Sequence, residues 1–398
     1  MSKKNKKAGI NQGILLLVGS CLQVMGSVLL GPVLQNVQIY FKNTPGVMVL
    51  TPVMLTIAAL TAALFAPIAG ILIDKFGRIK FLLVAFLAYS AFGTAPLYLQ
   101  SLNSIVISRA CLGLAEASIL TVCTTLIGDY FQGAKRTTWL SLQGAFTAFS
   151  AMIFFGLGGA LGDISWRAPF WLYLAGLVLF PLVLLLLWEQ EDEVEVTFEQ
   201  KARLPWPLLM AAYPFAIVTG ITLLMIPIQS SFVLNELGLY KPSLAGALSA
   251  ANSASVFFGA LGFRLLLRFG YAKIFGLAFA IDGIGVLIFS LAQGPAGLIL
   301  GGCLCGFGTG VLLVSLINWA LAAIPENVRG TGTGGFGACI LIGQFISPLI
   351  ILALRHSGLS LDGALSICGW VVLGLAIMGL LAPTMVRRAS KTTLISGA

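Results

Sequence analysis

The stretch GILIDKFGRIKFL, from Gly70 to Leu82, joins two long apolar runs through a short charged turn. The apolar runs on either side are each about 20 residues long, which is the length an α-helix needs to cross a lipid bilayer. The turn between them carries one aspartate, two lysines and one arginine. The stretch therefore predicts two membrane helices joined by a turn at the membrane surface.

The composition extends this prediction to the whole chain. Of its 398 residues, 58% are hydrophobic and only 9% are charged, and the mean hydropathy is +1.00. An ordinary soluble domain carries about 25% charged residues. We therefore expect an all-α membrane protein with twelve transmembrane helices. They lie near residues 13–39, 50–72, 79–98, 103–127, 138–161, 168–188, 207–233, 243–263, 273–292, 297–321, 332–354 and 362–385.

The basic residues predict the orientation of the chain in the membrane. Of the 23 lysines and arginines, 18 lie in the two terminal segments or in alternate loops on the same side. Because basic loops stay in the cytoplasm, both termini are expected there. The net charge of +9 is thereby explained without a nucleic-acid partner. We expect a multi-pass protein of a bacterial inner (plasma) membrane, in contact with the lipid bilayer and working as a monomer.

The cysteine and histidine residues do not suggest a metal site. All seven cysteines fall inside predicted spans, and the single histidine, His356, lies at an outer helix end. Cys303 and Cys305 are two positions apart, which fits neither a CxxC redox pair nor a zinc knuckle. The sequence predicts no metal and no cofactor.

A charged segment, EQEDEVEVTFEQKARLP, divides the predicted spans into two sets of six. We expect a first six-helix bundle at 1–188, a cytoplasmic linker at 189–206 and a second six-helix bundle at 207–398. At under twenty residues, the acidic segment is too short for a domain and is typical of a solvated linker.

The two halves also resemble each other in sequence. An offset of 193 residues carries Gly77 onto Gly270 and Arg136 onto Arg329. Repeats of six spans form two pseudo-symmetric bundles in many transporters, with the substrate site at their interface near the bilayer midplane. The repeat therefore favours a transporter.

Several motifs together resemble one family. GILIDKFGRIKFL is similar to the G-x-L-x-D-[RK]-x-G-R-x-[RK] loop of the major facilitator superfamily. Further matches are R-x-x-x-G at Arg109 and Gly113, SWRAPFWL at 165–172 and PENVRG at 325–330. The resemblance covers most of the chain. It implies a secondary transporter that moves a small-molecule substrate by alternating access, but a shared fold leaves the substrate open.

The resemblance also implies a conformational latch on the cytoplasmic side. In this interpretation Asp74 faces the positive end of the eleventh span, since a helix N-terminus attracts a carboxylate. The alternative is that Asp74 pairs locally with Arg78 or Lys80. The expected latch residues are Gly70, Asp74, Gly77, Arg78, Arg136 and Arg329.

Two charges in the fourth span, Arg109 and Glu116, are candidates for coupling transport to protons. The resemblance implies that the first, fourth, seventh and tenth spans line the central cavity, where such charges are tolerated. Seven positions are nearly two helical turns, so both lie on one face, about 10 Å apart along the axis. Glu116 either alternates between proton and substrate or is permanently hydrogen-bonded. Arg109 either tunes it, snorkels to the outer surface or braces a neighbouring helix.

The remaining candidates are mostly uncharged. Asp282 in the ninth span is a third proton-coupling candidate, although hydrogen bonding to a neighbouring helix suits its position outside the cavity set better. Pro32 and Pro227 predict kinks at comparable places in the two halves. The expected substrate-binding residues are Gln23, Gln35, Asn36, Gln229, Ser230, Asn318 and Trp319.

The function predicted from these residues is proton-coupled efflux of small amphipathic organic compounds. The alternative is uptake or exchange of a small organic anion with Arg109 as the clamp. The fifth span lacks the Gly-Pro pair that drug/proton antiporters usually carry, and an ion-independent facilitator also remains open. An enzyme is disfavoured, since no Ser/His or paired-carboxylate constellation is present. A receptor or scaffold would not need the repeated loops.

Overall fold

The computed structural model describes residues 8–189, 206–324 and 329–395. Within these ranges the chain is helical and contains no strand. Twelve helical stretches of the described chain are long and apolar enough to cross a membrane. The predicted all-α fold with twelve spans is confirmed.

The chain divides into two compact units, Met1–Glu195 and Val196–Ala398. The predicted linker at 189–206 falls almost entirely outside the described residues. The first unit contains α1 (Ile10–Val28), η1 (Gly31–Val33), α2 (Leu34–Tyr40), α3 (Val47–Phe76), α4 (Arg78–Thr94), η2 (Ala95–Leu97), α5 (Leu102–Tyr130), α6 (Gly133–Gly162), η3 (Ala168–Leu174) and α7 (Ala175–Leu186). The second unit contains α8 (Trp206–Glu236), α9 (Pro242–Leu266), η4 (Leu267–Phe269), α10 (Tyr271–Leu291), α11 (Pro295–Ala323), α12 (Arg329–His356) and α13 (Leu361–Ile395).

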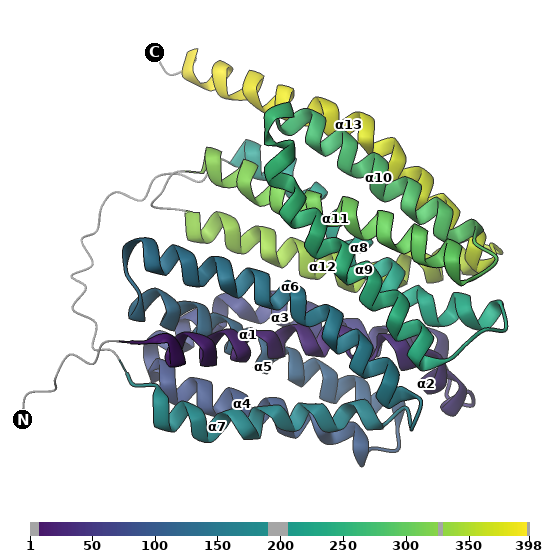
Figure 1. The fold of residues 1–398 in the computed structure, drawn as a ribbon, viewed down its shortest axis with the longest axis horizontal. Helices are drawn as coiled ribbons and strands as arrows, with labels where there is room; N and C mark the ends of the chain where they lie inside the picture. Colours follow the sequence, from purple (N-terminus) through teal and green to yellow (C-terminus); the bar gives the residue numbers. More distant parts are fainter. Residues whose placement is uncertain (1–7, 190–205, 325–328, 396–398) are drawn as a thin grey trace, which may run out of the picture. The chain divides into compact units, whose positions relative to one another are not determined.

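Helix α5 lies at the centre of the first unit, where it packs against α1, α3 and α4 (Figure 1). Gly113 of α5 lies so close to Ala58 and Thr61 of α3 that a Cβ atom would not fit. The Thr61 hydroxyl donates a hydrogen bond to the carbonyl of Ala110 at 2.9 Å. Small residues and interhelical hydrogen bonds hold membrane helices together in this way. Consequently, side chains on several faces of α5 are buried.

The first span is interrupted before Pro32. Helix α1 ends at Val28, the three-residue η1 contains Pro32, and α2 begins at Leu34. Proline has no N–H to donate, and the last carbonyls of a helix lack partners within it. The first span is therefore interrupted at the place where the sequence predicts a kink. The corresponding span of the second unit differs, because its helix α8 runs without interruption through Pro227.

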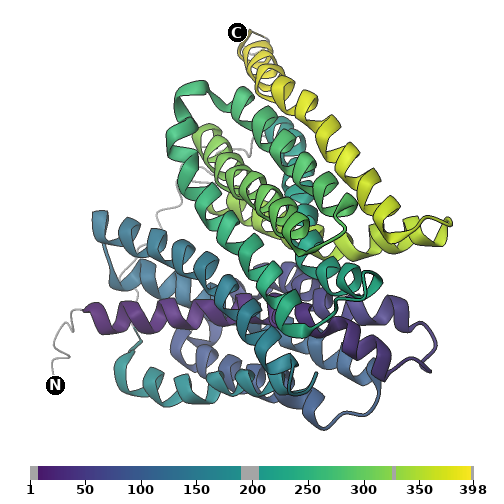
Figure 2. The ribbon, with the colours of Figure 1, turned by 45° about the vertical axis from the view of Figure 1, so that its right-hand side comes forward.

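In the second unit α10 packs against α11 and α13, and α12 packs against α8. Gly308 of α11 lies against the backbone of Ala278 and Asp282 on α10, with no room for a Cβ atom. Figure 2 shows the long α13, in yellow, along one side of this unit. The close contact of α10 and α11 places Asp282 in the interior of the unit.

Candidate functional site

The two charges of α5 converge on one residue of α1. Arg109 and Glu116 are both 0% exposed. Arg109 Nη2 donates a hydrogen bond to the carbonyl of Gly26, in the last turn of α1. Glu116 Oε1 lies directly against the Cα of the same glycine, where a Cβ atom would clash with it. The candidate site is therefore formed within the first unit, at the contact of α1 and α5.

Arg109 braces three elements of the first unit. Its guanidinium bonds to α1, and its Cζ lies 5.0 Å from the centre of the Tyr173 ring of η3. A cation above an aromatic face is stabilised by the ring quadrupole, most strongly where water is excluded. The side chain does not snorkel to the surface, because it is wholly buried. Of the roles predicted for Arg109, these contacts support the one in which it braces a neighbouring helix.

Glu116 is buried without the contacts that usually stabilise an ionised carboxylate. Neither carboxylate oxygen has a hydrogen-bond partner among the described residues. No ion pair joins Glu116 to Arg109 in that part of the chain, although the two charges interact electrostatically. The described residues therefore do not supply the permanent hydrogen bond that one of the two interpretations of Glu116 requires, and its role in proton coupling stays a prediction. Burying an unpaired charge is costly, so this environment suits a carboxyl group that takes up and releases a proton.

Asp282 lies in a different environment, in the second unit. It is wholly buried, and Thr309 of α11 donates a hydrogen bond to its Oδ2 at 3.2 Å. The hydroxyls of Thr309 and Thr222 are 3.2 Å apart, which extends the contact to α8. The carboxyl therefore links α10 to two neighbouring helices, as the interpretation of a hydrogen-bonded aspartate predicts.

The sequence matches a known protein family over most of its length. A sequence profile of the Major Facilitator Superfamily matches residues 16–348. The chain belongs to this superfamily. The class H tetracycline resistance protein of Pasteurella multocida is 24% identical over 385 residues, covering 92% of this chain and 94% of that protein. The 3-(3-hydroxy-phenyl)propionate transporter of Escherichia coli is 26% identical over 340 residues, covering 80% and 81%.

The fold is that of solved superfamily transporters. A bacterial homolog of the human lysosomal transporter Spinster, in an inward-facing and occupied conformation, matches with a TM-score of 0.74. The match covers 96% of each chain at 15% sequence identity. At this identity the likeness shows the fold alone. The family match, together with the twelve helices of membrane-span length in the described chain, makes this an integral membrane transporter of the superfamily.

Part of the predicted latch lies in the superfamily loop at the start of α4. Gly77 has a φ of 85°, a conformation that other residues rarely adopt. Glu189 accepts hydrogen bonds from the backbone N–H groups of Arg78 at 2.7 Å and Ile79 at 3.0 Å. The Arg78 guanidinium forms a 3.1 Å ion pair with Asp129 of α5. Glu189 therefore caps α4 and ties the end of the sixth span to this loop.

The other latch residues are less constrained. A Cβ atom at Gly70 would meet no atom of the described residues within 4 Å. The Arg136 guanidinium lies beside Gly128 of α5. The side chains of Asp74 and Arg329 lie outside the described residues. The latch itself stays a prediction.

The expected substrate-binding residues differ in exposure. Asn318 is exposed, Gln23 and Asn36 are half-buried, and Gln35 and Gln229 are buried. Ser230 is buried, and its hydroxyl lies 3.1 Å from that of Ser249 on α9. Trp319 packs edge-on against Phe275, with ring centres 5.6 Å apart. The last two side chains pack inside the second unit, and the binding role of all seven stays a prediction.

Sequence reasoning missed several members of the first-unit site. Gly26 and Tyr173 contact Arg109, and the Tyr89 hydroxyl donates to the carbonyl of Leu22 on α1 at 2.9 Å. Buried Gln143 of α6 donates to the hydroxyl of Ser20 at 2.7 Å. A polar amide within an apolar span is a visible signal, and Gln143 carried it. Gly26 offered none, since small residues are common in membrane helices.

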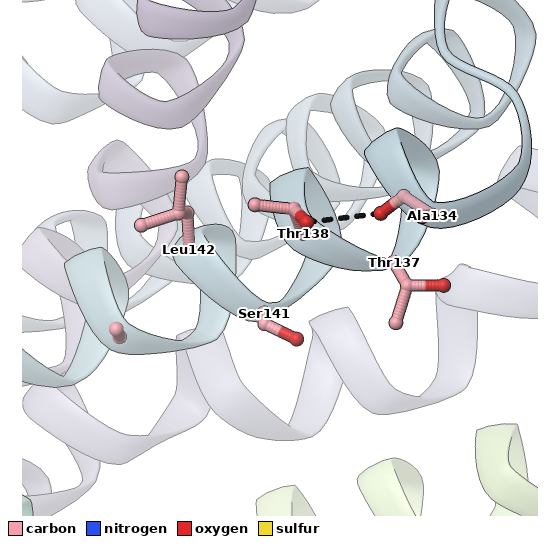
Figure 3. Close-up of a pocket in the computed structure, with 6 residues that line it drawn as sticks. Ala134, Thr137, Thr138, Ser141 and Leu142 are labelled. Carbon is pink, nitrogen blue, oxygen red and sulfur yellow. Dashed lines mark hydrogen bonds between the residues drawn. The ribbon is translucent and has the colours of Figure 1, made fainter.

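A shallow hollow lies along the N-terminal half of α6 (Figure 3). It is lined by Thr137, Thr138 and Ser141 together with Ala134, Leu142 and Ala145. Thr138 donates its hydroxyl to the Ala134 carbonyl at 2.9 Å. The spacing of three and four residues puts these side chains on one helix face. This hydroxyl-bearing face of the fifth span was not among the predicted binding residues.

Proposed function

We propose that this transporter exchanges protons for small amphipathic organic compounds and exports them by alternating access. The observation that carries the proposal is the wholly buried Glu116, which has no hydrogen-bond partner among the described residues and lies beside Arg109. Acids inside membrane spans are rare and usually take part in ion or substrate movement. Among the relatives, the tetracycline resistance protein supports an organic compound as the substrate, and the efflux pump dotC of Dothistroma septosporum supports export.

In this mechanism Glu116 binds a proton in one conformation and releases it in another. Its contact with Gly26 couples the carboxyl to the end of α1, immediately before the break at Pro32. Arg109 contacts the same glycine and supplies a fixed positive charge near the carboxyl. Proton binding therefore changes the charge at the point where the first span changes direction. A ligand or proton shifts a conformational equilibrium when it binds the two states differently.

The test is transport by the purified protein in liposomes with an imposed pH gradient, using tetracycline as the probe. Glu116→Gln keeps the shape of the side chain but cannot release a proton, so gradient-driven accumulation should be lost while exchange without a gradient remains. Glu236→Gln is the matched control. Glu236 lies at the end of α8 in a partly exposed 3.4 Å ion pair with Arg355, and its variant should transport normally. Full coupling in Glu116→Gln would remove this residue from the mechanism.

A second candidate is transport of an organic anion clamped by Arg109. The 3-(3-hydroxy-phenyl)propionate transporter and the gallate transporter of Pseudomonas putida among the relatives favour it. The guanidinium is buried and already bonded to Gly26, which argues against its use as a clamp for a substrate anion. Arg109→Lys keeps the charge but loses the planar fork. A selective loss of 3-(3-hydroxyphenyl)propionate transport over tetracycline transport would favour the anion clamp; equal effects would favour a tuning role.

A further inference from the structure

Tyr173 has a position that the arrangement of spans alone does not explain. It belongs to the sixth span, outside the set expected to line the cavity, yet its ring lies under the guanidinium of Arg109. The residue is wholly buried. Its hydroxyl makes no hydrogen bond of normal geometry with the described residues, and the side chain with which it comes nearest to one is that of Arg109. That hydroxyl interacts electrostatically with both Arg109 and Glu116. Burying a polar hydroxyl is unfavourable unless nearby groups compensate it, and here the nearby groups are the two charges of α5.

Helix α4 fixes the ring from the other side. Ser90 donates a hydrogen bond from its hydroxyl to the Tyr173 carbonyl at 2.9 Å. Gly93 faces Cβ and the ring of Tyr173, and a Cβ atom at that glycine would not fit. The ring of Tyr89 lies 5.4 Å away, at an angle of 52°. Backbone and ring are thus both held, so Tyr173 forms a rigid surface for the guanidinium.

We propose that Tyr173 is a positioning residue of the proton-coupling site, which holds the Arg109 guanidinium in the plane where it bonds to Gly26 and faces Glu116. The proposal rests on the proposed function of Glu116. The guanidinium of Arg109 is carried by a long, flexible side chain. Only one of its nitrogens bonds to the backbone of α1. The aromatic face supplies the second contact that a defined orientation requires.

The charges around Glu116 limit what else could set its protonation. Arg109 lies on its own helix, Tyr89 on α4 and Tyr173 on η3. Helices α1 and α3 present no titratable side chain that interacts with it among the described residues. Of these groups only Arg109 carries a charge at neutral pH. The position of the Arg109 guanidinium is therefore the feature of the site that most strongly affects the protonation of Glu116.

The first experiment compares Tyr173→Leu with Tyr173→Phe in the liposome assay with tetracycline across a range of pH. The leucine variant removes the aromatic face. A displaced guanidinium stabilises the ionised carboxylate less, so half-maximal transport should move to higher pH by about half a unit or more. The phenylalanine variant keeps the face and should retain the wild-type profile. Wild-type profiles in both variants would overturn the proposal, and so would equal shifts in both.

Phe170→Leu is the matched control. Phe170 is also a wholly buried ring of η3, and its ring centre lies 6.2 Å from that of Tyr173. Its loss should lower thermal stability without moving the pH profile. If Phe170→Leu moves the profile as far as Tyr173→Leu does, the effect is one of packing and the proposal fails.

A double-mutant cycle separates this proposal from the proposed function. The melting temperatures of Tyr173→Leu, Arg109→Gln and the double variant should be non-additive, because the two side chains act as one unit. This readout does not depend on proton coupling. If Glu116→Gln still transports in response to the pH gradient and the melting temperatures are non-additive, the proposed function is wrong but the positioning role stands. Additive melting would overturn the positioning role even if Glu116 carries the proton.

Discussion

Gly26 of α1 and Glu116 of α5 are in direct contact, with the carboxylate oxygen in the space that a side chain at position 26 would occupy. The same glycine accepts a hydrogen bond from Arg109 through its carbonyl. One glycine thus connects both charges of the fourth span to the first span. Membrane helices approach this closely only where one of them carries a small residue.

Gly26→Ala should damage both stability and coupling. The added methyl group collides with the Glu116 carboxylate and forces α1 away from α5, which we expect to cost roughly 1–3 kcal/mol. The melting temperature in detergent should fall, and gradient-driven transport should fall further than stability alone explains.

The control for this variant is Gly156→Ala on α6. A Cβ atom there meets no described atom within 4 Å. Alanine is favoured over glycine in a helix by about 1 kcal/mol, so this variant should melt at the same or a slightly higher temperature. Equal behaviour of the two alanine variants would contradict the contact between Gly26 and Glu116.

The fold was predictable from the sequence because membrane burial appears directly in hydropathy. Each span is a local run of apolar residues, so their number and approximate bounds could be predicted before the structure. Arg109 and Glu116 stood out for the same reason, as charges within an apolar run. The break at Pro32 followed from the missing N–H of proline.

Contacts between spans were not predictable in this way. Gly26 is one of 46 glycines, and nothing adjacent in the chain distinguishes it from the others. Tyr173 follows Arg109 by 64 positions, and only the packing of η3 against α4 brings it under the guanidinium. Glu189 begins an acidic segment that resembles a solvated linker, but the structure shows it as the cap of α4. Local patterns determine the helices, whereas the site depends on which helices meet.

The cap formed by Glu189 should contribute measurably to stability. Its carboxylate satisfies two backbone N–H groups at the start of α4, where the helix dipole also favours a negative charge. Glu189→Ala should therefore cost about 1 kcal/mol, measured by thermal unfolding in detergent. Glu189→Gln retains one oxygen as an acceptor and should lose less. If the glutamine and alanine variants are both as stable as the wild-type protein, the cap is not formed in solution.

Asp74→Asn tests the latch. If the Asp74 carboxylate faces the positive end of the eleventh span, its neutralisation should weaken the cytoplasmic closure by roughly 1 kcal/mol and increase the population of inward-open forms. Cysteine labelling from the cytoplasmic side, at positions such as Asn318→Cys, should become faster. The control is Asp163→Asn. Asp163 is an exposed residue at the C-terminal end of α6, and its variant should leave the labelling rate unchanged. Unchanged labelling in Asp74→Asn would rule the latch out.

Asp282 provides the complementary test, because its environment is that of a structural hydrogen bond. The carboxyl accepts from Thr309, which in turn meets Thr222, so three helices of the second unit depend on this acceptor. Asp282→Asn keeps an oxygen in place and should retain gradient-driven tetracycline transport. Asp282→Leu removes the acceptor, so the buried Thr309 hydroxyl keeps only its contact with Thr222, and we expect this loss to cost about 1–3 kcal/mol. Its melting temperature should fall well below that of the asparagine variant. A stable Asp282→Asn protein that has lost pH-gradient-driven transport would show instead that Asp282 carries protons, and the coupling mechanism would then involve the second unit as well.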